Sequence, residues 1–311
     1  MRKILEILVQ NRRPLTMLIA MMCGVILYRP LSFVDGVTGG TIAPTLIFSM
    51  LFVTFCKVRV RELKITTLQV WLILFQVVAA PVSYYMFLPF GELVAQGAMI
   101  CFLAPIAMGA VAIGALLGAN ISTLASYSLV CNIVIAFVAP YYLDIFGNGE
   151  CTLVQILLRV GPLLLAPLAA AQLLKLVWKS AAEWIAKHSQ MSFYMWLMSM
   201  VITLSRTTNY VIMTKHDIAL ATALALAAVA LFSCVAQYGV GRFIGRRFGD
   251  SVAGAQSLGQ KNTVLVVWIA QTFLSPISSI APTAYIIWQN LVNSYQIYAH
   301  DKKSKKNSAK E

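Results

Sequence analysis

The segment from Gln256 to Asn262, QSLGQKN, places two glutamines, a serine, a lysine and an asparagine inside a long apolar stretch. Polar, unwound backbone at membrane depth is tolerated where it lines a cavity or is buried in protein. Amide, hydroxyl and ammonium groups in such a place can bind a coupling ion or the polar part of a substrate. The segment is therefore the first candidate for a binding site.

Lys261 is the most informative residue of this segment. A cation at the bilayer centre costs about 2.5–3.5 kcal/mol on insertion scales, and all eleven acidic residues fall in predicted loops or at the termini. Three interpretations stay open. The side chain snorkels to a helix end, or the amine is neutral because burial disfavours its charge, or it pairs with an anionic substrate. The last two can alternate within one transport cycle.

Further amides and hydroxyls lie at predicted membrane depth. They include Gln76, Asn120, Ser128, Asn132, Gln237, Gln271, Gln289 and Asn290. A single Asn or Gln in a membrane helix more often joins two helices than binds a ligand, but these residues concentrate in a few segments. No metalloprotease, serine-hydrolase or P-loop motif occurs, so we expect no enzyme, and no cofactor. The six cysteines lie apart, so we also expect no metal site.

The composition indicates that lipid surrounds most of the elements that carry these residues. Of 311 residues, 59% are hydrophobic and 11% are charged, whereas soluble domains contain about 25% charged residues. Apolar runs of about 20 residues, the length of a membrane-spanning helix, follow one another along the chain. We therefore expect an all-α membrane protein with ten transmembrane helices. The expected spans are 14–34, 40–56, 68–88, 95–117, 120–142, 152–177, 191–212, 217–241, 252–273 and 276–298.

The basic residues that give the chain its net charge of +13 predict its orientation. Most lie at the termini and in alternate loops, and the other loops hold Arg29, Arg206 and Lys215. The positive-inside rule then predicts an inner-membrane protein with both termini in the cytoplasm. Aromatic residues do not interleave with the basic clusters, so nucleic acid is not an expected partner.

The polar connection Lys175–Gln190 divides the ten spans into two groups of five. Because five is odd, the second group is inverted relative to the first, which is the usual construction of secondary transporters. The stretch LGANISTLASYS, from Leu117, resembles LSPISSIAPTAY, from Leu274, and each follows the fourth span of its half. In sequence order, 1–177 holds the first repeat and span 6, and 178–311 holds spans 7–10 and a basic tail. The QSLGQKN segment predicts that span 9 is broken, and discontinuous helices in matching positions mark substrate sites. The tract Ala107–Asn120 predicts either a matching break in span 4 or close helix packing through its small residues.

Three stretches of the chain resemble the bile acid:sodium symporter family. The segment GQKNTVLVVWIAQTFLSPISSIAPTAYIIWQN (Gly259–Asn290) is similar to that family's unwound segment, its Ser-Pro turn and its helix ending in Asn. FQVVAAP (Phe75–Pro81) resembles its Gln-x-x-x-x-Pro, and GANISTLASYSLVCNIVIAFVAP (Gly118–Pro140) resembles its crossover and following helix. The layout of all ten spans is also similar.

The resemblance implies a panel domain of spans 1, 2, 6 and 7 and a core domain of spans 3–5 and 8–10. Broken spans 4 and 9 cross at the centre of the core. It further implies symport of an organic anion, bile-acid-like or a small carboxylate, with sodium, as the core moves against the panel. The positive ends of half-helices at the crossing suit an anionic group.

This chain departs from the family at the sodium ligands. Ser257 stands where the family has a glutamate, and Lys261 stands where it has a sodium-binding glutamine. An ammonium and a sodium ion cannot share the site, because like charges about 4 Å apart repel by about 4 kcal/mol at an effective dielectric near 20. We therefore expect the Lys261 amine to occupy the second sodium site and reach toward Gln76. Coupling is then to protons, or absent.

The expected site residues fall into two sets. The coupling site, or its lysine substitute, comprises Gln76, Ser128, Ser257, Gln260 and Lys261, and the substrate site comprises Asn120, Asn262, Gln289 and Asn290. Two alternatives stay open. One is a transport-inactive sensor or partner subunit of the same fold, with Lys261 as a structural plug, and the other is a carrier of another family with the same crossover.

Overall fold

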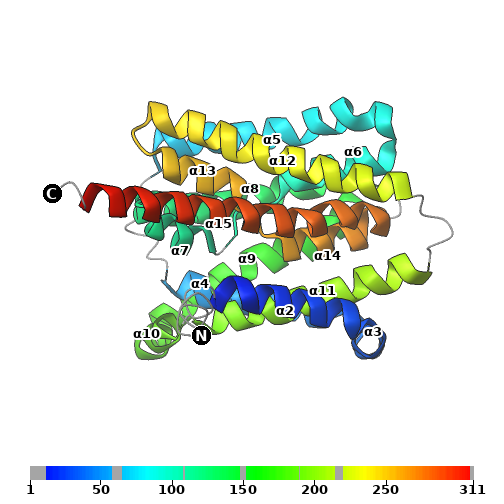
Figure 1. Cartoon of the computed structure of the whole chain (residues 1–311). Coiled ribbons are helices and arrows are strands. Elements are labelled where there is room, and N and C mark those ends of the chain that lie inside the picture. Colours follow the sequence, from blue (N-terminus) through cyan, green and yellow to red (C-terminus); the bar gives the residue numbers. More distant parts are fainter. Residues whose placement is uncertain are drawn as a thin grey trace, which may run out of the picture.

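The computed structural model describes residues 12–57, 65–107, 109–147, 152–188, 190–213 and 220–308. These residues form helices and no strand (Figure 1). The α-helices are α2 (Arg12–Ile26), α3 (Tyr28–Val37), α4 (Ile42–Lys57), α5 (Thr67–Phe87), α6 (Glu92–Leu103), α7 (Gly109–Leu116), α8 (Ile121–Phe146), α9 (Leu153–Val177), α10 (Lys179–Lys187), α11 (Gln190–Met213), α12 (Leu220–Arg247), α13 (Ser251–Gly259), α14 (Thr263–Phe273) and α15 (Ile280–Ser308). Short 3₁₀ turns, η2 (Leu88–Phe90) and η3 (Pro276–Ser279), follow α5 and precede α15.

Several of these helices are suited to a membrane by length and apolar composition. Within the described ranges, Thr67–Phe90, Ile121–Phe146, Leu153–Val177 and Leu220–Arg247 are each long and apolar enough to cross one. The bent pair α2 and α3, with an angle of 76° between them, would make a fifth if it is one span. Each of the ten predicted segments overlaps one helix or two consecutive helices, and the predicted fourth and ninth each overlap a pair.

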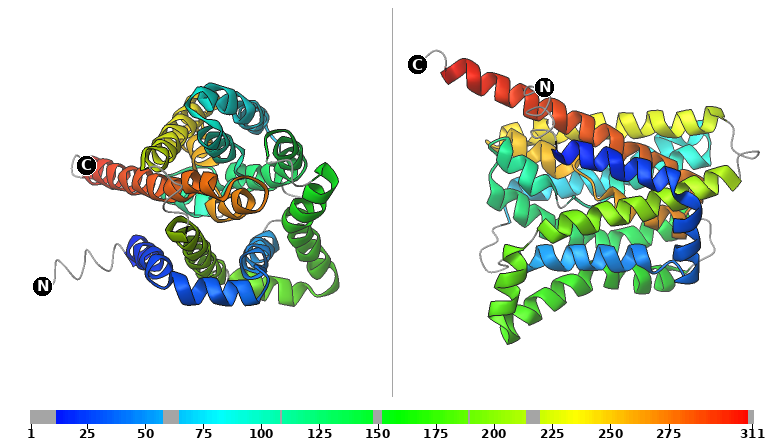
Figure 2. Two further views of the ribbon diagram at one scale, coloured as in Figure 1. Left: turned by 90° about the vertical axis from the view of Figure 1, so that its right-hand side faces the viewer. Right: turned by 60° about the horizontal axis from the view of Figure 1, so that its bottom comes forward.

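The helices pack in two groups, which Figure 2 separates in its end-on view. In the α11 group, α2, α3 and α4 pack on α11, and α9 packs on α4. In the α12 group, α6, α13 and α15 pack on α12, α5 packs on α6, α7 and α8 contact α13, and α14 packs on α15. The groups meet where α8 contacts α9 and where α14 contacts α4 and α11.

One end of the bundle carries exposed basic residues and is called the basic end here. The last turns of α4 and α12, with Lys57, Arg246 and Arg247, lie there, and so does α10, with Lys179 and Lys187 (Figure 1). The first residues of α2 and the last of α15 lie at the same end. The described part of the chain therefore starts and finishes on one side of the bundle, which agrees with an even number of crossings.

Four details differ from the sequence-based expectations. The predicted polar connection between spans 6 and 7 contains the helix α10, and α15 continues to Ser308 through lysines predicted to form a tail. Asp35, predicted to lie in a loop, is buried in α3, and Arg206, predicted to lie in a loop, lies in α11. The Asp35 prediction was wrong because α3 continues to Val37, past the expected end of the span at 34. The Arg206 prediction was wrong because the residue lies within the expected span 191–212, where its charge is paired and does not mark a loop.

Two helices of the α12 group, α6 and α13, stop inside the bundle. Ala104 has ψ 128°, as expected for a residue before Pro105, because the proline ring disfavours helical backbone there. The second interruption begins where α13 ends at Gly259, and Gln260 has extended backbone. Asn262 then caps α14, because its Oδ1 accepts a hydrogen bond from Leu265 N (3.4 Å). A few local residues therefore account for each interruption.

Glycines bring α12 and α13 into backbone contact. A Cβ at Gly254 of α13 would overlap the carbonyl oxygen of Gly241 and lie 2.9 Å from the Gly245 Cα, both on α12. A Cβ at Gly241 would in turn overlap the Gly254 carbonyl oxygen. The obstructing atoms are backbone, so no side-chain rotation relieves the overlap.

We expect Gly254→Ala to destabilise the protein by about 1–3 kcal/mol, the usual cost of overpacking a close contact. Gly239→Ala is the matched control, because a Cβ at Gly239 of α12 meets nothing within 4 Å. The control should be neutral or slightly stabilising, since alanine favours a helix over glycine by about 1 kcal/mol. Unfolding by SDS titration in mixed micelles measures both, and equal stabilities would contradict the close contact.

Candidate functional site

The two interruptions meet at the centre of the α12 group and pair with each other. Ala107 N donates to Gln260 O (2.8 Å) and Asn262 N donates to Pro105 O (2.8 Å), so that Ile106 and Lys261 face each other in an isolated antiparallel bridge. An antiparallel pair of this kind has local two-fold symmetry. Two backbone N–H groups and two carbonyls that lie outside the helices thus pair with each other inside the bundle. This meeting point is called the crossing below.

The carboxyl end of α6 presents a row of carbonyl oxygens to the crossing. Carbonyls in the last turn of a helix lack intrahelical donors and carry partial negative charge. Here side chains from three other segments supply the donors. The hydrogen bonds run from Gln237 Nε2 to Cys101 O (3.2 Å), from Lys261 Nζ to Phe102 O (3.4 Å), and from Gln76 Nε2 to Leu103 O (3.2 Å) and Ala104 O (2.8 Å).

Lys261 is held at both ends in this arrangement. Its backbone N donates to Gln289 Oε1 on α15 (3.0 Å), and its Nζ lies 3.4 Å from Phe102 O. The side chain is only 1% exposed, so it does not snorkel to the surface. No carboxylate of the described residues forms an ion pair with it. Its amine therefore sits where carbonyl oxygens gather, which is a position suited to a cation.

Each half of the chain supplies a glutamine and a tyrosine around the crossing. Tyr127 on α8 donates to Gln76 Oε1 on α5 (2.8 Å). Gln237 on α12 donates to the Tyr285 hydroxyl on α15 (3.2 Å), which donates to Gly259 O (2.9 Å) at the end of α13. The amides are thereby oriented with their NH₂ groups toward the carboxyl end of α6. The tyrosines were not among the predicted site residues. Tyr127 lies in LGANISTLASYS and Tyr285 in LSPISSIAPTAY, the two stretches of similar sequence.

Several buried polar atoms near the crossing have no hydrogen-bond partner among the described residues. They are Ser257 Oγ on α13, Asn262 Nδ2 at the break, and Thr263 Oγ1 in the first turn of α14. Buried polar groups in native proteins are nearly always bonded, so unpaired ones call for water, an ion or a ligand. Asn262 Nδ2 in particular is a free donor beside the amino end of α14.

The structure brings most of the predicted site residues together. Gln76, Ser257, Gln260, Lys261, Asn262 and Gln289 are all buried at or next to the crossing. Ser128 is buried in α8, where its carbonyl accepts from Asn132 Nδ2 (2.7 Å). Asn290, next to Gln289 on α15, is partly buried and donates to Ile286 O (2.7 Å).

Asn120 lies apart from the other predicted substrate residues. It is exposed and begins α8, where its Oδ1 accepts from Ser122 N (2.9 Å) and Thr123 N (3.2 Å). Its own N donates to Asp250 Oδ2 (2.9 Å) at the start of α13. These contacts make it a helix cap that ties the amino ends of α8 and α13 together, away from the crossing.

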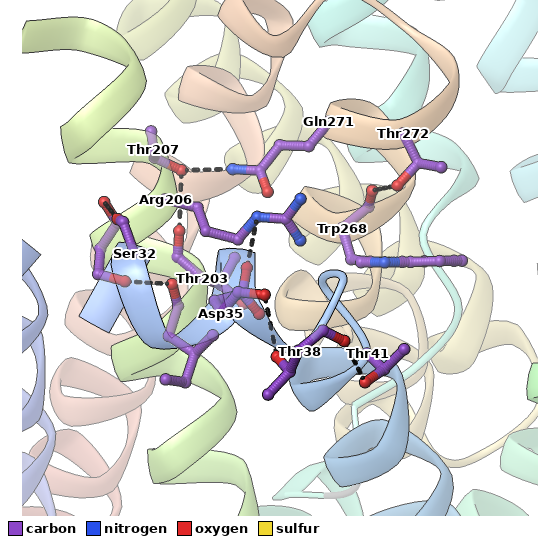
Figure 3. Close-up of polar contacts among 12 residues, drawn as sticks. Ser32, Asp35, Thr38, Thr41, Thr203, Arg206, Thr207, Trp268, Gln271 and Thr272 are labelled. Atoms are coloured by element: carbon purple, nitrogen blue, oxygen red, sulfur yellow. Dashed lines mark hydrogen bonds and ion pairs between the residues drawn. The ribbon is translucent and has the colours of Figure 1, made fainter. Parts of the chain in front are cut away.

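A second polar cluster, which the sequence did not indicate, lies between α3, α11 and α14 (Figure 3). Arg206 Nε pairs with Asp35 Oδ2 at 3.2 Å, and the Asp35 side chain is 5% exposed. The neighbouring Thr207 accepts a hydrogen bond from Gln271 Nε2 (2.9 Å) on α14. The first contact lies inside the α11 group, and the second joins the α11 group to the α12 group.

No protein-family model matches the chain, and no curated protein matches it in sequence.

We expect Gln76→Leu to destabilise the protein by about 2–4 kcal/mol, because it leaves two buried carbonyls without a donor. Gln172→Leu on α9 is the matched control, since the buried Nε2 of Gln172 has no hydrogen-bond partner among the described residues. The control should be neutral or stabilising. SDS titration monitored by tryptophan fluorescence measures both variants, and equal losses would show that Gln76 does not cap α6.

Proposed function

We propose that this chain is a secondary transporter of an organic anion, bile-acid-like or a small carboxylate, which works by alternating access and needs no sodium. The observation that carries the proposal is the position of Lys261. Its amine comes from the break between α13 and α14 and lies inside the bundle, against the carboxyl end of the other interrupted helix, α6. Ionisable residues at such depth mark function by default.

The Lys261 amine takes the place of a coupling cation in this proposal. In transporters with broken helices, carboxyl ends of half-helices and unwound carbonyls coordinate sodium. Here Phe102 O faces the ammonium, and the amides of Gln76 and Gln237 occupy the carbonyls on either side. Those carbonyls are therefore already supplied with donors. Because none of these carbonyls is left for sodium, we expect transport to be coupled to protons through the Lys261 amine, or to be uncoupled.

The amino end of α14 is the proposed binding site for the anionic group of the substrate. Helix amino ends carry partial positive charge and bind anionic groups. Asn262 adds a buried, unpaired Nδ2 donor at this end, and Thr263 adds an unpaired hydroxyl. A carboxylate placed there would meet donors that have no partner within the described part of the protein. The ammonium of Lys261, one residue earlier, supplies the compensating charge.

The helix order supports a ten-span protein built from two inverted repeats. Each half contains three segments, a broken pair (α6 with α7, α13 with α14), and a long closing helix (α8 or α15). The glutamine–tyrosine pairs and the local two-fold at the crossing agree with this construction. In the proposal, the α11 group is the panel and the α12 group is the core. In the proposal, the basic end faces the cytoplasm, so that both termini lie on the cytoplasmic side of the inner membrane.

We expect transport that persists when sodium is replaced by choline. Organic anions are first screened by thermal stabilisation at two pH values with and without sodium, and the best anion is then followed into proteoliposomes. Wild-type uptake should not depend on sodium, and Lys261→Ala should lose it. A strict and stoichiometric sodium requirement that survives Lys261→Ala would contradict the proposed role of the amine.

Lys261→Gln serves as the informative second variant. It removes the charge and restores an oxygen ligand, so it should come nearest to sodium-dependent uptake, although Ser257 still supplies no carboxylate. A protein that binds the anion without any accumulation in vesicles would instead be a sensor or partner subunit. Binding and flux measured on the same preparation separate these outcomes.

A further inference from the structure

The hydrogen bond between Gln271 and Thr207 joins the two helix groups at the end of the bundle opposite the basic end. Gln271 Nε2 on α14 donates to Thr207 Oγ1 on α11 at 2.9 Å, as Figure 3 shows. The Thr207 hydroxyl itself donates to Thr203 O (3.1 Å), which leaves its lone pairs free to accept. Thr207 is 8% exposed and Gln271 is partly buried, so the bond is largely shielded from solvent.

The α11 side of this contact is fixed by neighbours within its own group. Arg206, adjacent to Thr207, pairs with Asp35 of α3 at 3.2 Å. One residue further back, Ser205 O accepts a hydrogen bond from Ser32 Oγ of α3 (3.2 Å). Removing one partner of a largely buried ion pair is costly, because the other charge is left unpaired. These contacts hold Thr207 in place within the α11 group. If the two groups move apart, Gln271 therefore has to move away from Thr207.

The α14 side of the contact is only partly satisfied. Gln271 Oε1 is buried and has no hydrogen-bond partner among the described residues, although its Nε2 is bonded to Thr207. A buried amide with one unpaired atom is expected to find a partner when its surroundings change. Among the described residues, the bond to Thr207 is thus the side-chain hydrogen bond that holds Gln271 in place.

The same helix carries the crossing at its other end. Lys261 and the cap residue Asn262 directly precede α14, and Gln271 follows Lys261 by ten positions, about 15 Å along a helix axis. A helix of this length moves as a rigid element. Any displacement of the crossing is consequently transmitted to Gln271, with no intervening break in the described chain.

We propose that Gln271 and Thr207 form a latch that holds the α11 and α12 groups closed at the end opposite the basic end, and that α14 links this latch to the occupancy of the crossing. This inference rests on the proposed transport function and names its regulation. Binding at Lys261 and Asn262 would pull or release α14, and the latch would open or close accordingly. The Asp35–Arg206 pair positions Thr207 and stays intact in both states.

Amide hydrogen exchange tests the latch without any substrate. Wild-type protein in lipid nanodiscs is compared with Thr207→Val and Gln271→Leu, and exchange is followed in peptides that cover 263–273. Loss of a single net hydrogen bond should raise the opening equilibrium, and hence exchange, about fivefold. Unchanged exchange in both variants would overturn the latch.

Thr272→Val is the matched control. It makes the same substitution as Thr207→Val, one position after Gln271, but removes only a bond back to Trp268 O (2.7 Å) within α14. Such a bond to the carbonyl four residues earlier does not stabilise a helix, so its loss should not loosen α14. Exchange in the control should stay close to wild type. If the control rises as much as Thr207→Val, the effect is a general weakening of α14, and the latch is again wrong.

A disulfide between Thr207→Cys and Gln271→Cys links the latch to transport. Oxidation, verified by mass spectrometry of the cross-linked peptides, should stop anion uptake, and reduction should restore it. Full uptake by the cross-linked protein would contradict the latch. Increased exchange in the two latch variants together with no uptake by the wild-type protein would leave the latch in place and refute the transport function, so the two failures are distinguishable.

Discussion

Backbone polar groups that leave a helix inside an apolar bundle must find partners within the protein, and the rest of this structure follows from that constraint. The two interrupted segments satisfy part of it by pairing with each other at Ile106 and Lys261. The remaining carbonyls of α6 require donors, and α5, α12 and the break itself provide them. The polar residues of the bundle centre are thus explained first as caps, and their arrangement then creates a place where charge can be held.

The local two-fold at the crossing is exact in the backbone hydrogen-bond pattern and broken in the side chains. Lys261 faces Ile106, so one half contributes an amine and the other an alkyl chain. The glutamines differ as well, because Gln76 donates to Leu103 O and Ala104 O, whereas Gln237 divides its donors between Cys101 O and Tyr285. A symmetric frame with asymmetric chemistry concentrates the charge on one side of the crossing.

The sequence predicted the helices and the interruptions well, because both depend on local composition. Apolar runs located the helical segments except α10, which lies in a predicted polar connection, and the QSLGQKN stretch located the break before α14. The partner of Lys261 could not be predicted, since it is the backbone carbonyl of Phe102, 159 positions away, and any residue type would provide the same carbonyl. Asp35 was placed in a loop because the 76° bend between α2 and α3 leaves no mark in hydropathy. Asn120 was misleading because an exposed helix cap and a ligand share the same residue type.

The glycine contact between α12 and α13 limits which helices can shift relative to each other. Side chains absorb small strains by changing rotamer, but the backbones at Gly241 and Gly254 have nothing between them to adjust. The two helices therefore form a stiff unit, and deformation is displaced to contacts made through longer side chains. The contact between α14 and α11 is made through longer side chains. Because α12 and α13 cannot shift against each other, we expect movement at the contact between α14 and α11.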